Sequence, residues 1–138
     1  MVLRKLQHGI KNVSNNAMYK PPQWGVAVTD EAAKEIHKCV AKHPRETASV
    51  NDNLRRVFEQ LRSGKRLASF KFGFFRSEGD GLYRIGQTGV PGARETRLYI
   101  FPDEASSTVF VLGMGDKDMQ QRDIKHAKEM IRDIRGNK

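Results

Sequence analysis

Hydrophobic positions follow two different periods along the chain. Between about residues 30 and 63, apolar side chains recur every three or four positions, which is the period of an amphipathic helix. From about residue 67 they recur at every second position, the period of a strand with one buried face. The change of period predicts an α+β fold, with helices and strands segregated along the chain.

The helical half predicts two helices. One spans 30–43, with Thr29 or Asp30 as its N-cap and Pro44 ending it. The other spans about 50–63, with Gly64 as its C-cap. Because only a short polar link joins them, we expect an antiparallel helical hairpin that packs on a sheet.

The strand-period segments predict a mostly antiparallel sheet. A short strand "WGVAV" (24–28) precedes the helices, and four more follow them: "FKFGF" (70–74), "GLYRIG" (81–86), "TRLYIF" (96–101) and "TVFVLGM" (108–114). The turn-forming link "FPDEASS" makes the last two strands antiparallel neighbours. A final helix is expected over about 118–134, so the architecture is one layer of helices on a sheet.

The chain divides into a basic N-terminal arm, residues 1–22, and a single domain, residues 23–138. The arm is rich in asparagine and ends in "KPPQ", which stops a helix, although a short helix within 2–13 is allowed. It lacks the apolar run of a secretory signal, and no segment reaches the roughly 18 apolar residues of a membrane span. The lone Cys39 excludes an internal disulfide and is interpreted as a small core residue rather than a reactive thiol. We therefore expect a cytoplasmic protein without a membrane partner.

The charge balance points to a polyanionic partner. Lysine and arginine number 25 against 16 acids, a net charge of +9. RNA or DNA is the commonest partner of such a chain, but an acidic protein or a membrane surface would also attract a chain with this net charge.

A basic segment joins the helical half to the strands. Between residues 62 and 76 the chain carries five cations, no acid and four interleaved phenylalanines, a mixture that can bind phosphates and stack bases. The alternative is that the phenylalanines are core residues, which we favour for them, and that the cations are a solvated rim. The candidate RNA-binding residues in and beyond this segment are Lys65, Arg66, Lys71, Arg76, Arg94 and Arg122.

A second group of candidates comes from the later strands. In "ETRLYIF" the alternation places Arg97, Tyr99 and Phe101 on one face, opposite Leu98 and its neighbours. An arginine beside a tyrosine offers a guanidinium fork next to a ring that can donate a proton. With Arg84 and Lys117, these residues would line a concave surface whose only acids, Asp116 and Asp118, are explained as helix caps. The histidines and Cys39 lack metal-ligand spacing and no cofactor motif is present, so neither metal nor cofactor is expected.

Taken in order, "GLYRI", "RLYIF" and "VFVLGMGDKDMQQRDIKHAKEMI" resemble the C-terminal half of RelE/ParE-superfamily toxins, closest to the HigB-like (phage Gp49-like) branch. The upstream strand and helical hairpin agree, so the resemblance covers about residues 24–134. It implies a RelE-like fold and the toxin of a type II toxin–antitoxin pair. Such a toxin is a metal-independent mRNA endonuclease, bound to the ribosome or free, and a cognate antitoxin silences it.

The resemblance also implies roles for individual residues. Arg97 matches the family's phosphate-contacting arginine, and Lys117 matches the basic residue after the last strand. Two lysines of an earlier strand are replaced by Arg84 and Gly86, and arginine is a poor general base. The final helix has no tyrosine, so Tyr99 would have to serve as the acid and a desolvated Lys117 as the base.

Because the chain departs from the family's pattern at these positions, two other functions remain open. A ParE-like relative would use the same fold to inhibit gyrase. A catalytically silent member would bind RNA or protein and keep only the scaffold.

Overall fold

The computed structural model describes residues 3–7, 23–91 and 93–136, with side chains for all of these except 3–7. The elements are β1 (Leu3–Gln7), β2 (Gly25–Thr29), α1 (Asp30–Lys42), α2 (Pro44–Arg62), the 3-10 turn η1 (Leu67–Ser69), β3 (Phe75–Gly79), β4 (Leu82–Ile85), β5 (Thr96–Asp103), β6 (Thr108–Asp116), the 3-10 turn η2 (Lys117–Met119) and α3 (Gln120–Gly136). The predicted order of a strand, two helices, further strands and a helix is confirmed, and the fold class is α+β.

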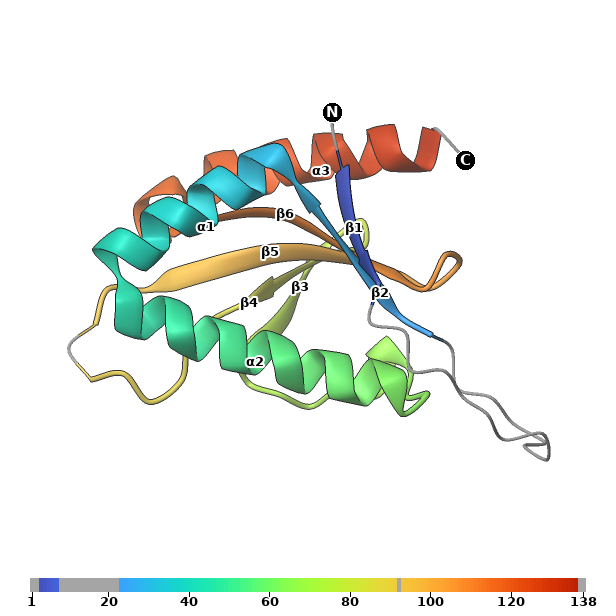
Figure 1. Cartoon of the computed structure of the whole chain (residues 1–138), viewed down its shortest axis with the longest axis horizontal. Helices are drawn as coiled ribbons and strands as arrows, with labels where there is room; N and C mark the ends of the chain where they lie inside the picture. The colour runs from blue at the N-terminus through green and yellow to red at the C-terminus, as the bar shows by residue number, and fades with distance from the viewer. Residues whose placement is uncertain (1–2, 8–22, 92, 137–138) are drawn as a thin grey trace.

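The described strands form one six-stranded sheet in the order β1-β2-β6-β5-β4-β3 (Figure 1). Only the β2–β6 pair is parallel, because α1 and α2 carry the chain away from β2 before it returns. β5 and β6 are antiparallel neighbours, as the "FPDEASS" link predicts, with Asp103 opposite Thr108.

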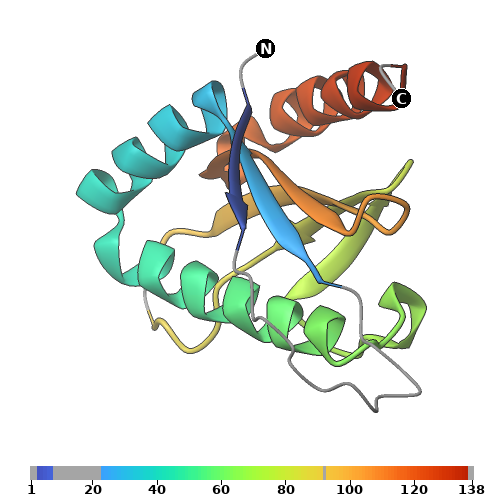
Figure 2. The same cartoon turned by 45° about the vertical axis from the view of Figure 1, so that its right-hand side comes forward.

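Helices cover both faces of this sheet, so the predicted single layer of helices is wrong. α1 and α2 pack on the face that carries Leu98 and Ile100, while α3 packs on the face that carries Tyr99 and Phe101 (Figure 2). The alternation along β5 is therefore as expected. Because β5 and β6 are apolar on both faces, each face needs its own cover.

The first two helices differ from prediction at their junction. Thr29 caps α1, its Oγ1 accepting a hydrogen bond from the Ala32 N–H at 3.0 Å. Pro44 begins α2 instead of simply ending α1, since a proline at the first helical position loses no hydrogen bond. α2 thus starts six residues earlier than expected, and the two helices diverge from His43 (Figures 1 and 2).

The segment "FKFGF" is not a strand. After η1 the chain stays irregular up to β3, and Phe70, Phe72 and Phe74 pack half-buried against the core under α2. The rings of Phe72 and Phe74 stack with centroids 4.7 Å apart. Phenylalanines at every second position are therefore half-buried here although the segment pairs with no strand of the described sheet. Their packing supports the interpretation of these rings as core residues.

Part of the predicted arm belongs to the sheet. Residues 3–7 form β1, which pairs antiparallel with β2, so this part is neither separate nor helical. The remainder of the arm, residues 1–2 and 8–22, lies outside the described residues.

β6 extends beyond its parallel partner. Its pairing with β2 ends at Val111, and α1 begins where β2 stops. Beyond Val111, a side chain of α1 bonds this edge of β6 instead of a strand: Glu35 Oε1 accepts a hydrogen bond from the Met114 N–H at 3.4 Å. Within the described residues no helix is both long and apolar enough to traverse a bilayer.

Candidate functional site

The candidate catalytic residues meet at one end of the sheet, where the loop 86–95 and the β6–α3 link come together. Thr96 at the start of β5 lies opposite Asp116 at the end of β6. The loop is held against α2 by Asn53, whose Nδ2 donates to the Gly86 carbonyl at 2.8 Å and to Thr88 Oγ1 at 3.1 Å. Asn53 is 3% exposed, so the loop is tied to the protein interior.

Arg97 is buried in this arrangement and its guanidinium is already occupied. The residue is 6% exposed. Its Nη2 lies 3.1 Å from Glu95 Oε1, and its Nη1 donates to the side-chain oxygen of Gln120 at the start of α3. These two contacts use two of the five N–H donors of the guanidinium, and the burial of Arg97 limits the access of a phosphate to the others.

The other cations at this end are also opposed by acids. Arg94 pairs with Asp116 at 3.2 Å and with Asp118, and Lys117 Nζ lies 3.8 Å from Glu95 Oε2. The expectation that only Asp116 and Asp118 oppose these cations is wrong. The missed residue is Glu95, which shares the face of Arg97 because it stands two positions before it. Asp116 caps η2, the 3-10 turn before α3, by accepting the Asp118 N–H at 3.0 Å, whereas the prediction placed both Asp116 and Asp118 as caps of the final helix itself.

Arg84 lies on the same face but is paired as well. It stands opposite Tyr99 in the β4–β5 register and opposite Arg76 in the β3–β4 register. Its Nε is 3.1 Å from Glu78 Oε1, and both side chains are about four-fifths buried. The strands therefore bring Arg84, Tyr99 and Arg97 together, but not as free cations.

Tyr99 is enclosed under α3. It is fully buried, and its hydroxyl has no hydrogen-bond partner among the described residues. Burial, followed by the charge of Asp123, raises the pKa of Tyr99 to about 12. The expected role of Tyr99 as an acid for a bound substrate is contradicted by this placement, because no substrate oxygen can reach the hydroxyl while α3 is in place.

Two acids that sequence reasoning missed approach the backbone of β6. A Cβ on Gly115 would lie 2.3 Å from Asp123 Oδ2, and a Cβ on Gly113 would lie 3.0 Å from Glu35 Oε1. Burial raises the pKa of Asp123 and of Glu35, and the neighbouring Asp123 charge raises that of Glu35 further. The glycines that end the apolar run of β6 thus make room for carboxyl groups from α1 and α3.

The predicted RNA-binding residues are placed differently. Lys65, Arg66, Lys71, Arg76 and Arg122 are exposed, and none of them has a salt bridge within the described part of the chain. Arg94 is about half exposed but bound to two acids. The basic segment 62–76 therefore presents free cations, unlike the end of the sheet.

The net charge is unevenly distributed along the fold. Residues 30–77 hold eleven lysines and arginines against six acids, a balance of +5, whereas residues 78–138 hold ten of each. The first range comprises α1, α2 and most of β3; the second contains every candidate catalytic residue. The expected concentration of uncompensated cations on the sheet around Arg97 is therefore wrong.

Metal and thiol chemistry find little support at these positions. No three of the His, Cys, Asp and Glu residues in the described ranges are arranged to hold a metal ion. Cys39 is 9% exposed, and burial raises the pKa of its thiol, which agrees with its interpretation as a core residue.

Comparison with known proteins adds no assignment. No family model matches the chain, and neither the curated proteins nor the solved structures contain a match.

Proposed function

We propose that the protein is an RNA-binding member of the RelE-like fold that acts as the toxin of a type II toxin–antitoxin pair. The observation that carries the RNA-binding part is the basic segment 62–76, whose exposed cations have no opposing acid and flank half-buried phenylalanine rings. The toxin part rests on the resemblance of residues 24–134, with an antitoxin protein as partner and translated mRNA, alone or on the ribosome, as target.

Cleavage of that mRNA is the second candidate function. What favours it is the adjacency of Arg84 and Arg97 on neighbouring strands, with Lys117 directly after β6. In such a reaction the ribose 2′-hydroxyl attacks the adjacent phosphate, whose growing charge needs a cation. Arg97 is 6% exposed and bonds Glu95 and Gln120, so cleavage requires the side chains that cover the guanidinium to move before a phosphate can reach it. Binding without cleavage needs no such movement and is therefore the primary proposal.

The test is induced expression followed by crosslinking to RNA and mapping of transcript ends. We expect growth arrest, recovery of RNA with the protein and intact transcripts. Cleavage inside translated codons would establish the second candidate instead. Gyrase-linked DNA breaks without bound RNA would identify a ParE-like inhibitor, and normal growth without bound RNA would overturn the proposal.

Matched variants separate the two candidates. Lys65→Gln/Lys71→Gln removes two cations of the basic segment, and Lys125→Gln/Arg132→Gln removes two exposed cations of α3 as a control. We expect the first pair to lose RNA and growth arrest and the second pair to keep both. Arg97→Ala, with Arg97→Lys to retain the buried charge, should abolish toxicity only if cleavage is the activity. Full toxicity of a folded Arg97→Ala protein would exclude cleavage at this position.

A further inference from the structure

α1 carries a basic ridge that no part of the proposed site uses. Lys34, Lys38 and Lys42 are exposed and lie four residues apart, so they share one side of the helix over about 12 Å. Arg45, in the first turn of α2, is exposed next along the chain. We define these four residues as the α1 ridge.

The ridge is free of intramolecular compensation. No salt bridge involves any of its four residues among those of the described chain. Two of the three acids of α1 are used elsewhere: Glu31 bonds His126 of α3, and Glu35 bonds the backbone of β6. The third, Asp30, is exposed one turn before Lys34 and forms no salt bridge with it in the described structure. The four cations of the ridge therefore face solvent without an ion-pair partner.

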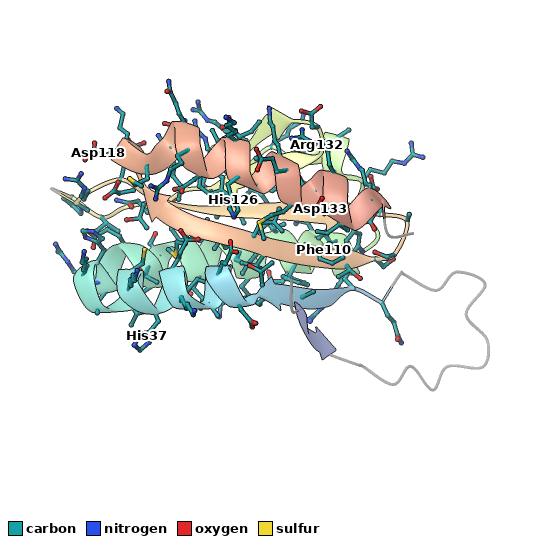
Figure 3. The ribbon with its side chains drawn as sticks, turned by 90° about the horizontal axis from the view of Figure 1, so that it is seen from above. His37, Phe110, Asp118, His126, Arg132 and Asp133 are labelled. Atoms are coloured by element: carbon teal, nitrogen blue, oxygen red, sulfur yellow. The ribbon has the colours of Figure 1, made fainter. Side chains whose placement is uncertain are left out.

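The ridge borders α3. Glu31 stands three residues before Lys34 and seven before Lys38, so it shares the side of α1 that carries the ridge, and it bonds His126 of α3 at 2.7 Å. His37 projects from a different side of α1, opposite α3 (Figure 3). A ligand on the ridge would therefore lie beside α3.

The composition of the ridge selects among nucleic acids. A single strand is usually held by aromatic rings on which its bases stack. No Phe, Tyr or Trp side chain of α1 or α2 is exposed in the described structure; Phe58, the one such residue on these helices, is 8% exposed, and the exposed ring of His37 projects from a different side of α1 than the ridge. Cations without stacking rings suit a duplex, whose bases are hidden and whose phosphates are the accessible groups.

We infer that the α1 ridge binds the phosphate backbone of double-helical RNA, as a contact surface separate from the basic segment 62–76. The choice of RNA rather than DNA rests on the proposed function. Together with the basic segment, the ridge belongs to residues 30–77, which hold a balance of +5, so a polyanion is attracted to this part of the molecule.

The experiment measures binding of the full chain to three fluorescent probes over a range of salt concentrations. The probes are an RNA duplex of about 20 base pairs, a DNA duplex of the same sequence and a single-stranded oligouridine. Lys38→Gln/Lys42→Gln is compared with the α3 pair Lys125→Gln/Arg132→Gln, which removes the same charge from another exposed helix face. Circular dichroism verifies that both pairs remain folded.

For the α1 pair we expect the salt dependence of duplex RNA binding to fall by about two phosphate contacts, with roughly tenfold weaker binding at low salt. The α3 pair should change by less than one contact, and oligouridine binding should be unchanged in both. Equal losses in the two pairs, or an equal loss for oligouridine, would overturn the inference. A loss confined to the DNA duplex would overturn the choice of RNA.

Failure of the proposed function has a different signature. If the wild-type chain binds no RNA of any kind, both conclusions fail. If it binds RNA and Lys65→Gln/Lys71→Gln weakens that binding while the α1 pair does not, only the α1 ridge is rejected.

Discussion

At the scale of single residues, Gly115 decides how closely α3 can approach β6. Any side chain at this position meets Asp123, because a Cβ would lie 2.3 Å from Asp123 Oδ2. The glycine-rich end of β6 is therefore a packing requirement rather than a phosphate-binding loop. Sequence reasoning could not find it, since the partner carboxyl stands eight residues further on in another element.

We predict that Gly115→Ala lowers the free energy of unfolding by about 1–3 kcal/mol, because Asp123 must leave its position. Denaturant unfolding measures this, with Gly73→Ala as control, since a Cβ on Gly73 has nothing within 4 Å. Adding Asp123→Ala to Gly115→Ala should recover part of the loss. If Gly115→Ala and Gly73→Ala are equally stable, β6 and α3 are not in close contact at Gly115.

Tyr99 can be used to test whether the sheet face under α3 is structural or catalytic. Its hydroxyl is buried without a hydrogen-bond partner in the part of the chain that the structure describes, which costs about 1–3 kcal/mol relative to a solvated hydroxyl.

We predict that Tyr99→Phe is at least as stable as the wild type, by up to about 1 kcal/mol, and keeps full activity in the growth and RNA assays. Thermal unfolding and induced expression measure the two effects. A stable Tyr99→Phe protein without toxicity would restore Tyr99 as a proton donor and would mean that α3 opens during the reaction.

At the scale of elements, α1 and α3 are joined across the free part of β6. His126 of α3 lies 2.7 Å from Glu31 of α1, on the side of α3 that faces α1 (Figure 3). The hydrogen bond to Glu31 raises the pKa of His126, while burial raises the pKa of Glu35 and Asp123 nearby.

These shifts act in the same direction on stability. The protonated His126 is favoured by folding, so its contribution is present below its unfolded pKa and is lost as the pH rises through its folded pKa. Glu35 and Asp123 are favoured in their neutral forms, so they also destabilise the fold as the pH rises through their raised values.

We predict that the unfolding midpoint falls as the pH rises from about 5 to about 8, and that Asp123→Asn flattens the lower part of this dependence. Glu31→Gln should lower the pKa of His126, which NMR titration of the imidazole measures. A midpoint that rises with pH over this interval would contradict the arrangement of the three groups.

The elements themselves were largely predictable. The helix over 30–43, the alternation of Arg97 and Tyr99 along β5 and the β5–β6 hairpin follow from period and turn residues. The segment 70–74 failed because phenylalanines at every second position satisfy a buried irregular segment as well as a strand. The single helical layer failed because β5 and β6, which are apolar at nearly every position, do not reveal how many faces are covered.

At the scale of the whole molecule, the net positive charge and the candidate catalytic residues lie in different parts of the chain. The balance of +5 belongs to residues 30–77, while residues 78–138, whose charges cancel, hold Arg84, Arg97 and Lys117 with their acids. Attraction to a polyanion therefore comes from the α1–α2 side and the basic segment. The α3 side is held together internally by ion pairs and by the contacts of Arg97 with Glu95 and Gln120.

The sequence by itself determined the class of fold, the order of its elements, the net charge and even where that charge lies along the chain, because these depend on local pattern and composition. Only the tertiary structure decided whether the arginines are free. Arg97 meets Gln120 and Arg84 meets Glu78 through packing and strand register, and whether a cation can bind a phosphate depends on such neighbours rather than on its own position in the chain.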